Sequence, residues 1–174
     1  MVDENTSKKK FYEKNSIQEY YDLIMEEYSV ERDKKNSFDS RAGIILGFLG
    51  IIVIYIFDGI KINELFNNLG DPIQLQPTLK ILVVLVTIIS FFVSLYYSIR
   101  VLNVEAYTGY KVSNITKDKL KNNSGIYTKA LFVMEYKEVV MSYRANNLIK
   151  AKYLYKSIFS IAILIISTFI KNSF

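Results

Sequence analysis

Three long stretches without a charged residue constrain this chain more than any other feature. Residues 42–57, 81–99 and 157–170 contain 16, 19 and 14 consecutive uncharged residues. Their apolar residues run continuously rather than in alternation, which predicts helices and not strands. At about 1.5 Å per residue, the second stretch nearly crosses a hydrocarbon core of about 30 Å. Because a backbone in lipid must satisfy its own hydrogen bonds, we expect three membrane-spanning helices.

The third stretch, residues 157–170, is the shortest, and it leaves two interpretations open. Its length also suits a buried core helix or a helix lying in the membrane interface. Lys156 and Lys171 at its two ends can extend their charges outward, and Tyr155 adds apolar length. We therefore favour a true span, with the core or interfacial helix as the alternative.

Positive charge is distributed unequally among the segments that these stretches separate. Residues 1–41 carry 8 Lys and Arg, residues 58–80 carry 2, and residues 100–156 carry 11. Three spans would place the first and third of these segments on the same side, and cytoplasmic segments carry the excess of Lys and Arg. We expect a multi-pass protein of the inner membrane with a cytoplasmic N-terminus, in which the first span serves as its own signal anchor.

Helical spacing of apolar residues continues on the cytoplasmic side of the first and third spans. Residues 14–39 and 126–170 contain neither Gly nor Pro. The first segment has a face made of Ile17, Tyr20 or Tyr21, Ile24 and Tyr28. The second has a face made of Val133, Tyr136, Val140, Tyr143 and Leu154. We expect these two helices to pack together as a cytoplasmic stalk.

The sequence thus predicts an all-α membrane protein with seven consecutive segments. These are a disordered tail (1–13), a cytoplasmic helix (14–40), transmembrane helix 1 (41–58), an extracytoplasmic loop (59–78), transmembrane helix 2 (79–99), a cytoplasmic basic helical segment (100–155) and transmembrane helix 3 (156–171).

The composition argues against an enzyme. The chain has no His and no Cys, which excludes serine–histidine triads, thiol nucleophiles, disulfides and zinc sites built from those residues. Its 7 glycines form no phosphate-cradling motif. Glu26, Glu27 and Glu31 are clustered, but no second group of ligands accompanies them, so we expect charges on a helix surface. We expect no catalytic residue, no cofactor and no metal.

A row of polar residues in the second span is the first candidate site. Thr87, Ser90, Ser94 and Tyr97 or Ser98 follow one another at steps of 3 or 4, so they share one helix face. Polar faces in lipid point inward, so this face is a candidate pore lining in an oligomer. The alternative, which we favour, is small-residue packing between helices of one subunit.

Glycines in the first span form a second candidate. Gly43, Gly47 and Gly50 lie on one face, where two helix backbones can approach closely. This face would contact either another copy of the chain or the second or third span.

The basic segment is the third candidate. Residues 100–156 hold 11 basic and 4 acidic residues, whereas residues 1–41 hold 8 basic and 10 acidic. Cations among tyrosines can hold a nucleotide phosphate and base. The positive-inside rule and attraction to anionic lipid explain the same excess without a ligand. The candidate ligand-binding residues are Lys117, Lys119, Lys121, Tyr127, Lys129 and Arg144.

The stretch from Phe38 to Gly50 resembles the segment that leads into the membrane in bacterial antiphage transmembrane effectors of the Pycsar type and in the related SLATT-like proteins. In those families a charged helix reaches an Asp-x-(Lys/Arg)-Ala step and then enters a small-residue-rich span. Asp39, Arg41 and Ala42 occupy these positions here. The resemblance covers roughly residues 20–57. Those families have two spans, so a third is a departure, and the three-span plan is similar to that of the Hailong membrane effector.

The resemblance implies a role in antiphage defence. A partner nucleotidyltransferase would supply a nucleotide second messenger or an oligonucleotide, and the membrane protein would respond by depolarising or permeabilising the membrane. The expected partners are the lipid bilayer, this signal and further copies of the chain in a homo-oligomer, with a tetramer as one option; duplex DNA is not expected. The alternatives are a non-conducting scaffold that anchors a cytoplasmic enzyme, and a small transporter or holin-like component.

Overall fold

The structure, a computed structural model, describes residues 4–58, 75–104 and 125–173, with side chains from residue 16 onward except at some helix ends. These ranges form three helices and contain no strand: α1 (Glu4–Asp58), α3 (Leu75–Leu102) and α5 (Gly125–Ser173). Each of the three is long and apolar enough to cross a membrane. The prediction of an all-helical chain with three candidate spans is therefore confirmed.

The chain divides into two compact units. Among the described residues, the polar unit comprises residues 4–36 and 125–148, and the apolar unit comprises residues 37–58, 75–104 and 149–173. Helices α1 and α5 each contribute a polar segment to the first unit and an apolar segment to the second. This division follows the charge pattern, because the uncharged stretches all fall in the apolar unit.

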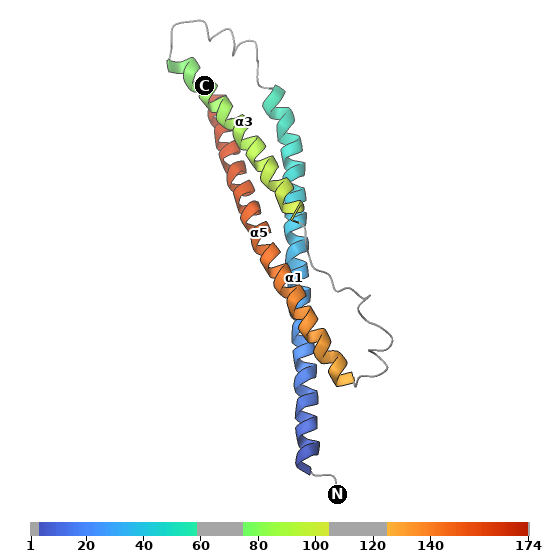
Figure 1. The fold of residues 1–174 in the computed structure, drawn as a ribbon. Coiled ribbons are helices and arrows are strands. Elements are labelled where there is room, and N and C mark those ends of the chain that lie inside the picture. The colour runs from blue at the N-terminus through green and yellow to red at the C-terminus, as the bar shows by residue number, and fades with distance from the viewer. Residues whose placement is uncertain (1–3, 59–74, 105–124, 174) are drawn as a thin grey trace. The chain divides into compact units, whose positions relative to one another are not determined.

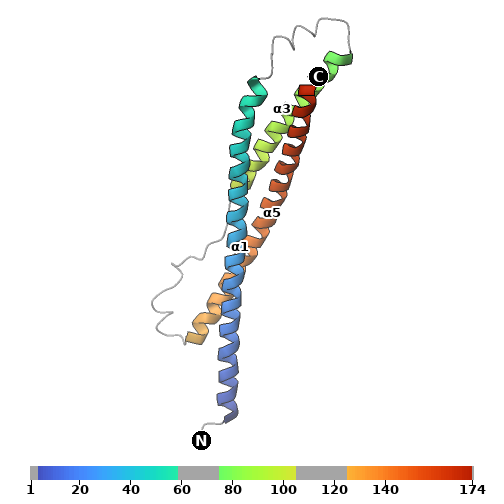
Figure 2. The same ribbon diagram turned by 180° about the vertical axis from the view of Figure 1, so that it is seen from behind.

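In the apolar unit, α3 runs antiparallel to the segments of α1 and α5 beside it (Figure 1), and the reverse view shows the same neighbours (Figure 2). Two clusters of buried apolar side chains hold these segments together. One consists of Leu49, Ile56, Phe91 and Leu164. The other consists of Ala42, Val101 and Leu154, with Phe38, Ile45 and Tyr153 against it. Each cluster draws residues from all three helices.

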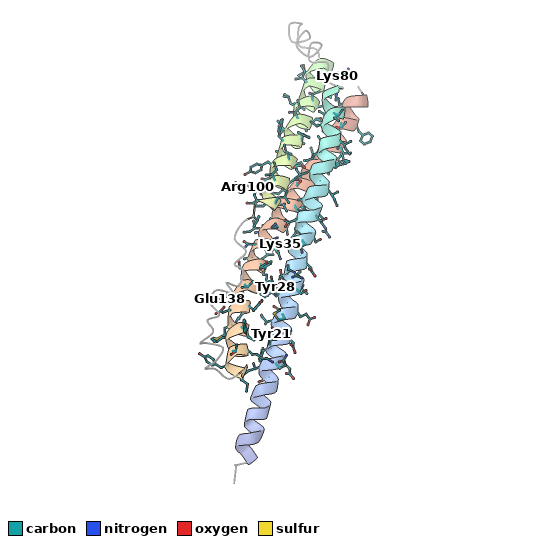
Figure 3. All side chains as sticks on the ribbon, turned by 90° about the vertical axis from the view of Figure 1, so that its right-hand side faces the viewer. Tyr21, Tyr28, Lys35, Lys80, Arg100 and Glu138 are labelled. Atoms are coloured by element: carbon teal, nitrogen blue, oxygen red, sulfur yellow. The ribbon has the colours of Figure 1, made fainter. Side chains whose placement is uncertain are left out.

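In the polar unit, α1 packs along α5. Tyr28 of α1 is labelled in Figure 3. It lies between two tyrosines of α5, with its ring centroid 5.5 Å from those of Tyr136 and Tyr143 in edge-on geometry. Val139 and Val140 of α5 are buried. Aromatic pairs at this separation and angle attract each other beyond the area that they bury. The predicted face of α5 is confirmed by these contacts, and on α1 the half-buried Tyr21, rather than the exposed Tyr20, continues the packed face.

Helix boundaries differ from the prediction at one end of the chain. Helix α1 begins at Glu4, so most of the predicted disordered tail (1–13) is helical. The absence of Gly and Pro before residue 43 gives the helix no stop signal there. Helix α5 covers residues 125–173 and so includes the predicted third span. The predicted loop lies outside the described residues over 59–74, as does the basic segment over 105–124.

Candidate functional site

A buried carboxylate organises the interface between α1 and α5 in the polar unit. Glu31 is only 3% exposed. Its side chain accepts a hydrogen bond from Asn147 Nδ2 at 2.8 Å and one from Lys34 Nζ at 2.7 Å. Asn147 Nδ2 also lies 2.8 Å from the Glu31 backbone carbonyl. Because a buried charge is costly unless it is paired and hydrogen-bonded, these contacts are what allow Glu31 to be buried.

Arg144 adds positive charge to this network. Its guanidinium lies 3.2 Å from Glu27 Oε2 and 3.6 Å from Glu31 Oε1. Burial raises the pKa of Glu31, but the hydrogen bonds from Lys34 and Asn147 and the charges of Lys34 and Arg144 outweigh burial, so this pKa lies below its usual value. The prediction that Glu31 is a helix-surface charge is wrong, because α5 places an amide and a guanidinium over it.

A shallow hollow of about 240 Å³ lies next to this network. It is lined by Leu23, Glu26, Glu27, Val30, Glu31, Lys34 and Arg144. Three carboxylates outnumber two cations there, so the hollow does not suit an anionic phosphate. Its two apolar residues and its acidic rim instead suit an apolar group with a positive charge beside it.

The predicted ligand-binding residues are not brought into one described site. Lys117, Lys119 and Lys121 lie outside the described residues. Lys129 donates a hydrogen bond to Gln18 of α1, and Tyr127 is 53% exposed. Together with Arg144, Lys129 therefore contacts side chains of α1. An anionic ligand would have to compete with those side chains for both cations.

The polar row of the second span is buried within the apolar unit. Thr87, Ser90, Ser94 and Ser98 are all nearly or fully buried. Ser157 of α5 lies between two of them, with its Oγ 3.1 Å from Ser94 Oγ and 2.7 Å from Ser98 Oγ. These contacts within one chain correspond to the packing alternative, and the pore-lining role stays a prediction.

The remaining members of the row also contact α5. Thr87 Oγ1 lies 2.9 Å from Ser167 Oγ. The ring of Tyr97 stacks on Tyr153 at 6.0 Å between centroids, and Lys156 Nζ lies 5.0 Å from the centre of the Tyr97 ring. The hydroxyls of α5 at residues 157, 160 and 167 recur at helical spacing, a signal that the sequence contains and that could have identified the partner face.

Sequence reasoning missed an ion pair in the apolar unit. Lys150 is 1% exposed and pairs with Asp39, whose side chain is 29% exposed. Lys150 falls on the same helix face as Val140, Tyr143 and Leu154, so the spacing placed it in the packed face. Counting the basic residues of each segment did not reveal the burial of Lys150, because such a count treats every Lys as exposed to solvent.

The glycine face contacts no other described helix. A Cβ atom added at Gly43, Gly47 or Gly50 would meet nothing within 4 Å. These glycines therefore do not provide a close approach to α3 or α5 within the described part of the chain, and a contact with another copy stays a prediction.

Comparisons of this chain with protein-family models, with curated proteins and with solved structures found no match.

Proposed function

We propose that this protein is an oligomeric effector of the bacterial inner membrane, gated by a nucleotide signal, that depolarises or permeabilises the membrane in antiphage defence. The observation that carries the proposal is the continuity of two helices. Helices α1 and α5 each join a charged segment to an apolar one without a break. A change in how the charged segments pack would therefore be transmitted along each helix into its apolar segment.

Competition for the cations of the polar unit supplies a gating mechanism. Arg144 pairs with Glu27 and Glu31, and Lys129 pairs with Gln18. Phosphate oxygens form strong charge-assisted hydrogen bonds with such cations. A nucleotide that draws Arg144 out of the acidic hollow and away from α1 would favour a different packing of α1 on α5. A ligand shifts such an equilibrium only by its difference in affinity for the two packings.

A non-conducting scaffold is the second candidate function, and a specific observation favours it. The hydroxyls of the polar row are engaged with α5 inside one chain. The exposed side chains of the described apolar segments include many large apolar residues, among them Ile44, Ile51 and Phe92. A bundle whose interior hydroxyls bond to one another and whose exterior is apolar is suited to anchoring a partner enzyme without conducting ions.

Conductance measurements separate the two functions. The purified protein in liposomes would be exposed to cyclic mononucleotides, cyclic dinucleotides and short oligonucleotides. The effector proposal requires conductance with at least one of these probes and depolarisation of cells when that nucleotide is made. If the protein never conducts and never depolarises cells, the effector function is excluded and the non-conducting scaffold remains.

The Arg144→Gln variant tests the gating step. It removes the charge that α1 and the nucleotide are proposed to share, so the nucleotide concentration needed for conductance should change. Lys152→Gln removes an exposed charge eight residues further along the same helix and serves as the matched control. Equal responses of the two variants would rule out Arg144 as the point of competition.

A further inference from the structure

A group of tyrosines and cations lies at one end of the apolar unit, where the uncharged stretch of α3 ends and that of α5 begins. The ring centroid of Tyr97 lies 5.3 Å from that of Tyr96 and 6.0 Å from that of Tyr153. The guanidinium carbon of Arg100 lies 5.4 Å from the centre of the Tyr96 ring, and Lys156 Nζ lies 5.0 Å from the centre of the Tyr97 ring. These five residues form one continuous group, which we call the tyrosine–cation cluster.

Arg100 is held in position by its own helix. Its Nε donates a hydrogen bond to Tyr96 Oη at 3.0 Å, and the residue is exposed. Among the described residues, the two terminal amino groups of this guanidinium have no hydrogen-bond acceptor. The planar fork of a guanidinium matches the oxygens of a phosphate group. Arg100 is therefore oriented and still has donors to offer.

No carboxylate in the described part of the apolar unit neutralises the cluster. This part of the chain contains two acidic residues, Asp39 and Asp58. Asp39 pairs with the buried Lys150, and Asp58 ends α1 at the far end of the first uncharged stretch. The cations at Arg100 and Lys156 are thus not balanced within the described unit, which favours an anionic partner.

Large apolar side chains continue from both cations into the uncharged stretches. Phe92, Tyr96 and Arg100 follow one another at steps of four residues and share one face of α3. Phe159 follows Lys156 by three residues on α5. Phe92 is 55% exposed and Phe159 is 58% exposed. A water-soluble anion would leave these rings in water, whereas the acyl chains of a lipid would cover them.

The contacts of the rings disfavour a nucleotide as this anion. Nucleotide bases bind by stacking on aromatic faces. The ring of Tyr97 stacks on Tyr153 and also has Lys156 against it, and the ring of Tyr96 has Arg100 against it. The cluster therefore offers cations more readily than ring faces, which suits a phosphate group without a base.

We propose that the tyrosine–cation cluster binds the phosphate of an anionic phospholipid, with Arg100 and Lys156 at the phosphate and the acyl chains along Phe92 and Phe159. The inference rests on the membrane insertion in the proposed function, which places the ends of the uncharged stretches at the height of the lipid headgroups. Basic pockets between transmembrane helices on the cytoplasmic side bind such headgroups. Because α3 and α5 each supply one cation, the bound lipid bridges the two helices.

Binding of defined lipids to the purified protein tests this site. The protein in detergent micelles would be titrated with phosphatidylglycerol or with phosphatidylcholine, and native mass spectrometry would count the bound lipids. Phosphatidylglycerol has a net negative charge, whereas phosphatidylcholine carries a choline cation beside its phosphate. The natural protein should therefore bind phosphatidylglycerol at least about fivefold more tightly.

Charge removal at the two ends of the same helices locates the site. Arg100→Gln and Lys156→Gln should each weaken phosphatidylglycerol binding about fivefold, and because both residues are exposed, the helices should be retained. Lys80→Gln and Lys171→Gln are the matched controls, because they remove one charge toward the opposite ends of α3 and α5. Figure 3 shows Lys80 and Arg100 toward the two ends of α3. Tyr96→Phe removes only the hydroxyl that orients Arg100, so it should cause a smaller loss.

Three outcomes would overturn the proposal. Equal losses in the cluster variants and in the control variants would mean a general attraction of anionic lipid to a positively charged chain. Equal affinity for the two lipids would mean that the cluster does not recognise headgroup charge. Displacement of phosphatidylglycerol by an equal concentration of ATP would mean that the cluster serves a soluble nucleotide.

Failure of this inference is distinguishable from failure of the proposed function, because lipid binding requires neither a signal nor conductance. A protein that conducts but does not discriminate between the two lipids would remove only this site. A protein that discriminates but never conducts would remove only the effector function. Release of the protein from phosphatidylcholine vesicles by a wash at high pH would instead remove membrane insertion itself.

Discussion

The two units differ in the polar groups that they bury and in the side chains that they expose. In the apolar unit, hydroxyl side chains such as Thr87, Ser94 and Ser157 lie inside, and large apolar side chains such as Ile51 and Phe159 lie outside. In the polar unit, Val139 and Val140 lie inside with Glu31 and Asn147, which are hydrogen-bonded to each other, and the exposed side chains are a mixture of charged and apolar ones. Helices α1 and α5 thus pack differently in the two units. Small hydroxyl residues allow close packing where lipid gives no hydrophobic drive between helices, whereas apolar burial provides that drive in water.

The exposed apolar side chains need a different explanation in each unit. In the apolar unit, the proposed bilayer accounts for them. In the polar unit, Tyr127, Met134, Met141 and Leu148 are exposed beside charged residues of α5, so a bilayer does not account for them.

The buried ion pair of the apolar unit should give the largest effect on stability. Lys150→Ala would remove the buried ammonium that pairs with Asp39. We expect a loss of about 2 kcal/mol, below the roughly 3–5 kcal/mol of fully buried pairs because Asp39 is 29% exposed. The free energy of unfolding can be measured in mild detergent by circular dichroism.

The control for this variant is Lys152→Ala, two residues away and exposed. It should stay within about 0.5 kcal/mol of the natural protein. Equal losses in the two variants would show that the pair contributes nothing specific.

The carboxylate of the polar unit should give the next largest effect. Glu31→Ala removes the carboxylate that accepts from Asn147 and Lys34 but keeps the backbone carbonyl that also accepts from Asn147, and we expect a loss of about 1–2 kcal/mol. Hydrogen exchange of the backbone in residues 16–36 measures this change locally. Asp22→Ala, an exposed acid on the same helix, is the control. Unchanged protection in Glu31→Ala would mean that the tyrosine contacts alone hold the polar unit.

The serine contacts of the apolar unit should give a smaller effect. Ser157→Ala removes a hydroxyl that contacts both Ser94 and Ser98. Hydrogen bonds between membrane helices contribute on average about 0.6 kcal/mol each, so we expect a loss of about 1 kcal/mol. Thr168→Val is the matched control, because Thr168 Oγ1 bonds only to the backbone of its own helix at Leu164. A larger loss in Thr168→Val would contradict the interhelical role of Ser157.

Acid should weaken the polar unit by the smallest amount. The pKa of Glu31 is lowered in the folded chain, so its stabilising contribution is present above the usual value of 4.5 and is lost as pH falls through the folded pKa. Unfolding midpoints measured from pH 6 downward should therefore fall less steeply for Glu31→Gln than for the natural protein. Identical slopes would show that Glu31 does not titrate differently on folding.

The sequence was sufficient to predict the helices and the direction of their faces. Uncharged length and helical spacing are local properties, which is why the three helices and the Tyr136, Val140 and Tyr143 face could be predicted. The partners of individual polar residues are not local properties. The burial of Glu31 depends on Asn147, 116 residues away, and the burial of Lys150 depends on Asp39, 111 residues away.

The candidate site was predictable only in part for the same reason. The polar row of the second span was correctly placed on one face, but spacing within one helix cannot say whether a hydroxyl faces a pore or another serine. Within the described chain Ser157 contacts two of these hydroxyls, and it belongs to a different helix.

The pair between Asp39 and Lys150 also has a consequence for biosynthesis. Asp39 precedes the first span and Lys150 precedes the last, so a ribosome makes the acid long before the base that neutralises it. Until α5 has been made, Asp39 therefore has no ammonium of Lys150 beside it. A chain that stops before residue 150 would lack this partner, which gives the cell a chemical difference between finished and unfinished copies.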